Sequence, residues 1–151
     1  MQEPASSEGY PVPHSIDAEK AVLGAVLLDV AALPLAVTVV RPEDFFRQAH
    51  ALVFRCMLDL QSRSLAPDFV TLKDELVRVG RLDDVGGPAY LSSLVDGMPL
   101  GSHVAQHAGI VREKARLRTA MAVANRLIAQ AYEQETTAAQ AVERAVQDLS
   151  L

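Results

Sequence analysis

The sequence is poor in the residues that stabilise secreted or aromatic-rich folds. Its 151 residues include no tryptophan, one cysteine and only 5% aromatic residues, although half of them are hydrophobic. A single cysteine, Cys56, cannot form an internal disulfide, which excludes disulfide frameworks and favours the reducing cytoplasm. Because the apolar residues are mainly Ala, Leu and Val, they favour closely packed helices. We therefore expect an all-α protein.

Long hydrophobic runs are also missing. No apolar stretch approaches the ~20 residues that a membrane span needs, so no membrane attachment is expected. Residues 1–13, MQEPASSEGYPVP, are polar and proline-rich, unlike a signal peptide. This composition predicts a disordered leader before the folded part.

Positive charge is scarce in the first two thirds of the chain. Residues 1–101 carry 8 Lys+Arg and 14 Asp+Glu, whereas residues 102–151 carry 6 and 5. Tight binding to nucleic acid phosphates usually requires a basic face, so only weak direct DNA binding, or none, is expected. Arg112, Arg116 and Arg118 remain candidates for contact with an acidic partner or DNA. An ordinary solvated helix face is the simpler interpretation.

Helical periodicity divides the rest of the chain at residue 101/102. Residues 14–101 read as a globular subdomain of several short helices, with Pro42 and its acidic neighbours entering one of them and Thr71 beginning another. Residues 102–151 read as two longer helices, the first from Ser102 to about Tyr132 and the second capped by Thr137. A short break joins them, which predicts a C-terminal antiparallel helical hairpin.

A two-helix hairpin cannot bury all of its apolar surface by itself. We therefore expect self-association, with an interface drawn from the apolar residues of the hairpin. Some of these residues are expected to hold the two helices of the hairpin together instead, and periodicity does not separate the two roles. The candidates are Leu117, Met121, Ala124, Ile128, Val142 and Leu149.

No motif in the sequence indicates catalysis or cofactor binding. Gly86-Gly87 precedes a predicted helix, but the P-loop pattern GxxxxGK[ST] is absent and Pro88 lacks an N–H, so the pair is interpreted as a turn. His103 and His107 share a helix face without a third ligand, which leaves a metal-dependent enzyme as a weak alternative. Cys56 and His50 do not face one another on one helix. We predict no catalytic, cofactor-binding or metal site.

Five fragments, read in order, resemble one known family. Together they are similar to the N-terminal domain of the DnaB-type replicative DNA helicases of bacteria and phages, and the resemblance runs from about Pro13 to Leu151. Two positions differ from the usual pattern, since His103 stands where Asn is usual and His107 where an aromatic residue is common. The fragments are HSIDAEKAVLGAVLLD, RPEDFFRQAHALVF, PDFVTLKDEL, RLDDVGGPAYLSSL and MPLGSHVAQHAGIVREKARLR.

The resemblance implies a specific role. In that family hairpins pair between subunits, and six domains form a collar of three dimers above the motor ring. The collar recruits the C-terminal domain of primase and, in some systems, a helicase loader. The ATPase motor, with its ATP and Mg²⁺, lies in a separate RecA-like domain. We therefore expect a fragment or natural short relative that self-associates, from dimer to hexamer, and neither hydrolyses ATP nor unwinds DNA.

A small helical module that binds single-stranded nucleic acid is the alternative from another class. It would use the face of Arg112, Arg116 and Arg118, but the acidic balance and the lack of aromatic stacking residues weigh against it. We predict no detectable binding of single-stranded DNA at ~50 mM salt, where phosphate contacts are strong. Measurable binding at that salt concentration would favour the nucleic-acid module.

Overall fold

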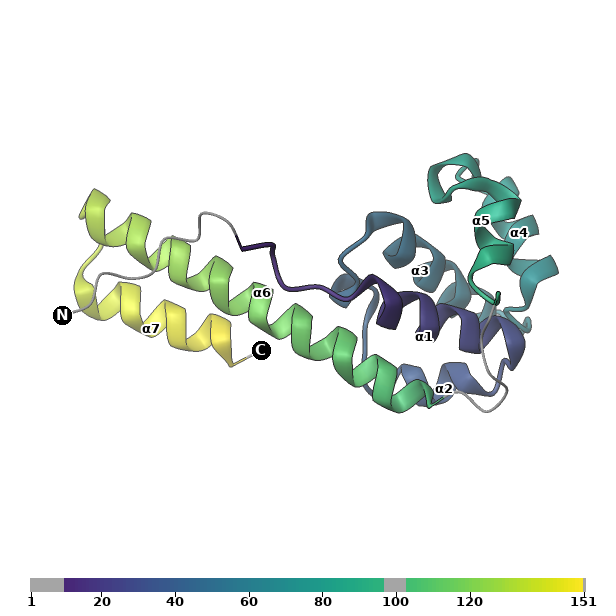
Figure 1. Ribbon diagram of the computed structural model, residues 1–151. Coiled ribbons are helices and arrows are strands. Elements are labelled where there is room, and N and C mark those ends of the chain that lie inside the picture. The colour runs from purple at the N-terminus through teal and green to yellow at the C-terminus, as the bar shows by residue number, and fades with distance from the viewer. Residues whose placement is uncertain (1–9, 97–102, 151) are drawn as a thin grey trace. The chain divides into compact units, whose positions relative to one another are not determined.

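The computed structural model describes residues 10–96 and 103–150. Every regular element in these two ranges is helical (Figure 1), which confirms the all-α prediction. None of the described helices is long and apolar enough to cross a membrane. The chain forms two compact units, one of residues 14–116 and one of residues 1–13 with 117–151.

The first unit contains five α-helices, two 3-10 turns and the beginning of a sixth α-helix. The sixth helix continues into the second unit, which also holds the last helix. In chain order the elements are α1 (Ile16–Leu28), α2 (Ala32–Ala36), η1 (Pro42–Asp44), α3 (Gln48–Ser62), α4 (Phe69–Arg78), η2 (Asp83–Val85), α5 (Gly87–Ser93), α6 (Val104–Glu133) and α7 (Ala138–Leu149).

Helix α3 forms the centre of the first unit, because it packs against α1, α4, η1 and η2. Its Phe54 and Met57 are fully buried, and the ring of Phe54 lies 5.0 Å from that of Phe45. Leu23 of α1 and Leu72 of α4 are equally inaccessible. Burying each large apolar side chain contributes about 1.5–3 kcal/mol, so α3 carries much of the stabilisation.

Side-chain caps determine where two of these helices begin. The Oγ of Ser15 accepts a hydrogen bond from the N–H of Ala18 at 3.2 Å, as expected for an N-cap residue. The Oδ1 of Asp68 accepts from the N–H of Thr71 at 2.9 Å. Asp68 is therefore the N-cap of α4, and the helix starts two residues before the predicted Thr71.

The helix predicted to begin at Pro42 is interrupted. Pro42 begins only the 3-10 turn η1, and α3 starts at Gln48 after a break. Phe45 and Arg47 have extended backbone conformations, with ψ of 131° and 129°. The acidic side chain of Asp44 is used locally, accepting from the N–H of Arg41 at 2.9 Å. The prediction of one continuous helix was wrong.

The double glycine forms a turn, as predicted. Gly86 and Gly87 have φ of +100° and +74°, a left-handed conformation that favours glycine. They end η2 and open the short helix α5. The predicted stop at Gly97 and the predicted cap at Ser102 lie outside the described residues.

The first part of α6 belongs to the globular unit. Val104, Ala108, Val111 and Ala115 are buried at helical spacing and form one apolar stripe. The unit therefore extends to Arg116, beyond the residue 101 that sequence composition suggested. The long helix is continuous across the boundary because no proline or cap interrupts it.

The second unit contains the predicted antiparallel hairpin, formed by the rest of α6 and by α7 (Figure 1). Thr137 caps α7, since its Oγ1 accepts from the N–H of Gln140 at 3.2 Å while the Gln140 side chain accepts from the N–H of Thr137. Arg126 of α6 and Asp148 of α7 form an ion pair at 2.5 Å. This pair sets the register of the two helices.

A buried carboxylate joins the end of α3 to α4. Glu75 is only 5% exposed and pairs with Arg63 at 2.8 Å and with Arg78 at 2.6 Å. Hydrogen bonds from Arg78 and Arg63 lower the pKa of Glu75 from 4.5 to about 2. Ionised Glu75 is therefore favoured by the folded state.

Replacing Glu75 by Gln should destabilise the first unit at pH 7, because Arg63 and Arg78 lose their shared anion. The lowered folded-state pKa stabilises the native state fully above pH 4.5, and this contribution is lost as the pH falls toward 2. Thermal melts between pH 7 and pH 2.5 should show the difference between wild type and Glu75→Gln shrinking below pH 4.5. The exposed Asp74→Asn, on the same helix, is the control. A pH-independent difference would contradict this role.

Candidate interaction surface

A buried chain of polar groups connects α1, α3 and α5. His50 of α3 is fully buried, with Nδ1 2.8 Å from Oε1 of Glu19 and Nε2 2.5 Å from the hydroxyl of Tyr90. Glu19, 1% exposed, also accepts from the backbone N–H of Phe46 at 2.8 Å and of Arg47 at 3.3 Å. The network thus satisfies a carboxylate that would otherwise be costly to bury.

The partners of His50 assign its tautomer. A carboxylate only accepts hydrogen bonds, so Nδ1–H donates to Glu19 and, in the neutral ring, Nε2 accepts from the hydroxyl of Tyr90. A guanidinium N–H of Arg47 donates to the same hydroxyl at 3.4 Å. Since the imidazole is inaccessible and both nitrogens are bonded, this His–Glu pair holds helices together and cannot reach a substrate.

The glycine turn is part of the same arrangement. A Cβ added to Gly86 would lie 2.8 Å from Cβ of Tyr90, closer than real side chains approach. The turn therefore brings the backbone against Tyr90 while α5 directs its hydroxyl to His50. The double glycine thus has a structural purpose and lacks the surrounding groups of a phosphate site.

The three candidate contact arginines have different surroundings. Arg112 pairs with the buried carboxylate of Asp44 at 3.1 Å, linking α6 to η1. Arg118 donates to the backbone carbonyl of Pro13 at 2.8 Å. Arg116 is exposed. Two of the three cations thus have intramolecular partners, which weakens the basic face required by the nucleic-acid alternative.

The histidines and the cysteine do not assemble into a reactive centre. His103 is exposed just before α6, and the Nδ1 of half-buried His107 makes no hydrogen bond with the described residues. No group of three possible metal ligands occurs among residues 10–96 and 103–150. Cys56 is buried, and desolvation raises the pKa of its thiol, with the charges of Glu75 and Asp59 adding to the effect.

All six predicted interface residues are exposed in the hairpin. The large ones range from Met121, at 39%, to Ile128, at 55%. The contact between the two helices involves other residues, chiefly Val123 and Ala141, which are buried, and Leu127, which lines a cleft with α7. The expectation that some of the six hold the hairpin together is therefore not met.

The exposed stripes of the two helices lie on one side of the hairpin. Successive helical residues are turned by about 100°, and Ala124 and Val142 each follow a residue of the inner contact, Val123 and Ala141. Antiparallel helices turn in opposite senses when viewed from one end, so the same offset brings both stripes to the same side. We call this surface the hairpin face: Leu117, Met121, Ala124, Ile128 and Ala131 of α6 with Val142, Val146 and Leu149 of α7.

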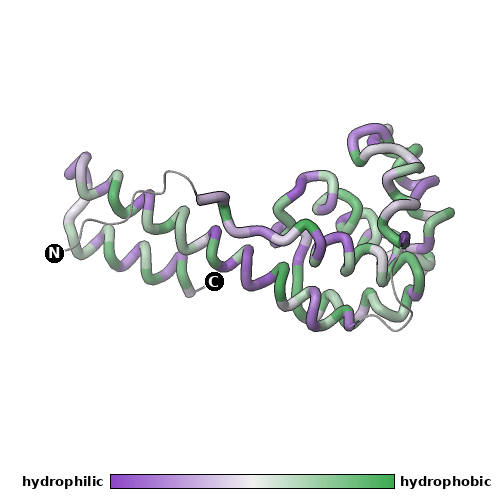
Figure 2. Tube along the Cα trace, in the orientation of Figure 1, coloured by the Kyte–Doolittle hydropathy of each residue, from purple (hydrophilic) through white to green (hydrophobic). Residues whose placement is uncertain are grey.

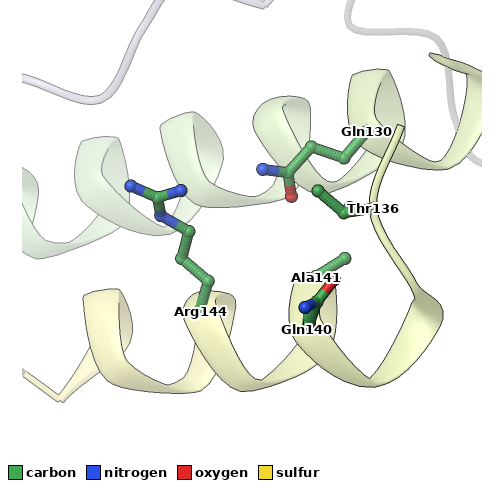
Figure 3. Close-up of a pocket in the computed structure, with 5 residues that line it drawn as sticks. All are labelled: Gln130, Thr136, Gln140, Ala141 and Arg144. Carbon is green, nitrogen blue, oxygen red and sulfur yellow. The ribbon is translucent and has the colours of Figure 1, made fainter. Parts of the chain in front are cut away.

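The hairpin face is uncharged and contains a cleft near the turn. Figure 2 shows hydrophobic positions recurring along both helices. The cleft, of about 540 Å³, lies between the helices where Leu127, Ala131, Ala138 and Val142 leave space. A smaller cleft of about 310 Å³ is lined partly by Gln140 and Arg144, whose side chain extends from α7 toward α6 (Figure 3). The helices are thus loosely packed at this end.

Comparison with known proteins identifies the family. Residues 11–113 match the model of the DnaB-like helicase N terminal domain, which is more than half of the chain. The chain belongs to this DnaB N-terminal domain family. The crystal structure of the N-terminal domain of DnaB helicase from Mycobacterium tuberculosis has a TM-score of 0.86 at 34% identity, covering 93% of this chain and 99% of that one.

Full-length relatives are much longer than this DnaB-family chain. It is 43% identical over 129 residues to the replicative DNA helicase DnaB of Geobacillus stearothermophilus, covering 85% of this chain and 28% of the relative. It is 37% identical over 123 residues to the replicative DNA helicase DnaC of Bacillus subtilis (strain 168), covering 82% and 27%. The chain thus spans little more than a quarter of either relative.

Several residues that position the surface and the core were not predicted to do so. Glu19, His50 and Tyr90 were noted only as marks of the resemblance, and their network was missed because they are far apart in sequence. A glutamate inside an otherwise apolar helix stretch, EKAVLGAVL, was the available signal. Val146 was missed on the hairpin face because the spacing was read through Ala145 instead.

Replacing Tyr90 by Phe should reduce the free energy of unfolding of the first unit by about 1–3 kcal/mol, because Nε2 of buried His50 loses its donor. Tyr132→Phe, at a side chain that is 85% exposed, should change stability negligibly. Urea unfolding followed by far-UV circular dichroism measures both. Equal stability of the two variants would show that the His50–Tyr90 contact contributes nothing.

Proposed function

We propose that this chain acts in DNA replication as the N-terminal collar domain of a replicative helicase. In this role it mediates subunit self-association and provides a docking surface for primase or a helicase loader. Membership of the DnaB N-terminal domain family gives the role its context. The observation that carries the proposal is the uncharged hairpin face, exposed over both helices.

Self-association follows from the energetics of that face. Leu117, Ile128, Val142, Val146 and Leu149 are each 42–58% exposed in the single chain. Exposed apolar area is unfavourable by roughly 25 cal/mol per Å² relative to its burial, and a contiguous patch of this kind is typical of a protein interface. A second hairpin offers a matching surface without any charge to desolvate.

Docking of the primase C-terminal domain, or of a loader, is proposed from the family resemblance. Helical hairpins bind helical partners through apolar grooves rimmed by charge. Exposed Arg116 and Glu143 lie outside the hairpin face and provide such charges. ATP hydrolysis and unwinding are not proposed for this chain, since the GxxxxGK[ST] pattern does not occur in its 151 residues.

Light scattering on a sizing column, across a concentration series, tests both parts of the proposal. We expect a dimer or larger species whose mass rises by whole primase C-terminal domains when that domain is added. Association should depend on concentration. A strict monomer would contradict the oligomerisation role, and an oligomer whose mass ignores both primase and loader would contradict the docking role.

Ile128→Asp should abolish the oligomers and leave residues 14–116 folded. Ile128 is 55% exposed on the hairpin face, so a carboxylate is tolerated in the monomer but must be desolvated in an interface. Sizing-column mass and helical circular dichroism, measured on the same sample, separate the two effects. Gln147→Asp, exposed on α7 outside the hairpin face, is the matched control. Loss of helicity in Ile128→Asp alone would place the residue in the intramolecular core.

A further inference from the structure

The two helices of the hairpin differ in length, which leaves one end of the hairpin face without cover. Arg126 pairs with Asp148, the residue before the end of α7 at Leu149. Met121 and Leu117 precede Arg126 by five and nine residues, about 7 Å and about 13 Å along the axis of α6. Helix α7 therefore ends before it reaches the level of Met121. Both side chains are exposed, at 39% and 42%.

The opposite end of the same face has space to accept side chains. The cleft of about 540 Å³ is centred between Ala131, Ala138 and Val142. Ala131 follows Arg126 by five residues, so it lies as far beyond the ion pair as Met121 lies before it. The hairpin face thus carries protruding side chains at one end and a cleft at the other, spaced evenly about Arg126.

Two arrangements with two-fold symmetry can bring two hairpin faces together. If both copies point the same way, α6 lies over the partner's α7. Both α7 helices then end at the same level, and Leu117 and Met121 stay exposed. If the copies point in opposite ways, α6 lies over the partner's α6, and the turn of each hairpin reaches the uncovered end of the other.

We propose that a second copy of this chain binds the hairpin face in the opposite orientation, with Met121 of each copy inserted into the cleft beside the partner's Ala131. This proposal rests on the proposed self-association and specifies its geometry. With the two-fold axis at the level of Arg126, large side chains meet small ones. Met121 faces the partner's Ala131, and Ile128 faces the partner's Ala124, a pattern that fills space efficiently.

The composition of the cleft fits this occupant. Its walls near the hairpin face are the small or branched side chains of Ala131, Ala138 and Val142. Methionine is unbranched and flexible, and it fills irregular apolar gaps well. The Met121 side chain, 39% exposed in the single chain, becomes buried in the pair without displacing any charged group.

Disulfide cross-linking between two different chains tests the orientation. Both chains carry Cys56→Ala to remove the native thiol, and one carries Met121→Cys while the other carries Ala131→Cys. Mixing them under mild oxidation should give a disulfide-linked dimer, because the Cα atoms of a disulfide lie only about 4.4–6.8 Å apart. Either chain alone should remain unlinked, and circular dichroism confirms that both are folded.

The same-direction arrangement has its own cross-link. There, Ala131→Cys on one chain should link to Val142→Cys on another, a pair that the proposed orientation separates by about ten residues of helix rise, roughly 15 Å. A dimer that forms this second link, or neither link, would overturn the orientation while leaving self-association intact. A wild-type chain that is monomeric by light scattering would instead refute self-association itself.

A truncation measures the contribution of the inserted side chain. Met121→Ala should weaken dimerisation at least about tenfold, as expected for an anchor side chain buried in a partner's cleft. Gln147→Ala, of similar size change on the other side of α7, should leave the dimer dissociation constant unchanged. Equal affinities of the Met121→Ala and wild-type chains would contradict the insertion of Met121.

Discussion

The carboxylate of Glu19 determines how the globular unit is assembled. It is buried and accepts the N–H groups of Phe46 and Arg47 together with Nδ1–H of His50. Two neighbouring N–H groups can point at one carboxylate only if the chain there is not yet helical. The break between η1 and α3, the position of α3 on α1, and the contact of His50 with Tyr90 on α5 all depend on this requirement. Removing one partner would leave a buried polar group unsatisfied, at about 1–3 kcal/mol.

The hairpin follows a different principle, because it has little interior of its own. Val123 and Ala141 are buried between its helices, while eight apolar residues face outward on one side. Two helices offer one contact line each, so a second apolar stripe on each helix requires another layer. The globular unit is stable through its own core, whereas the hairpin gains burial only through association. A domain organised in this way is suited to assembling subunits.

Much of the fold could be predicted from local patterns. The N-caps at Ser15, Asp68 and Thr137, the left-handed glycine turn and the apolar spacing of α6 and α7 are local features, and each was recognised or displaced by only a few residues. The break before α3 was missed because the favourable start at Pro42 and the extended residues that follow differ only in their distant partner, Glu19. The polar network was missed for the same reason.

The sequence by itself determined the all-α class, the hairpin, the family and the set of apolar residues available for association. Those properties depend on periodicity and capping, which operate over one or two helical turns. Tertiary structure alone decided which apolar residues hold the hairpin together and which face outward, because this depends on the register set by Arg126 and Asp148. It likewise decided the roles of Arg112 and His50, whose partners Asp44, Glu19 and Tyr90 are brought near only by packing.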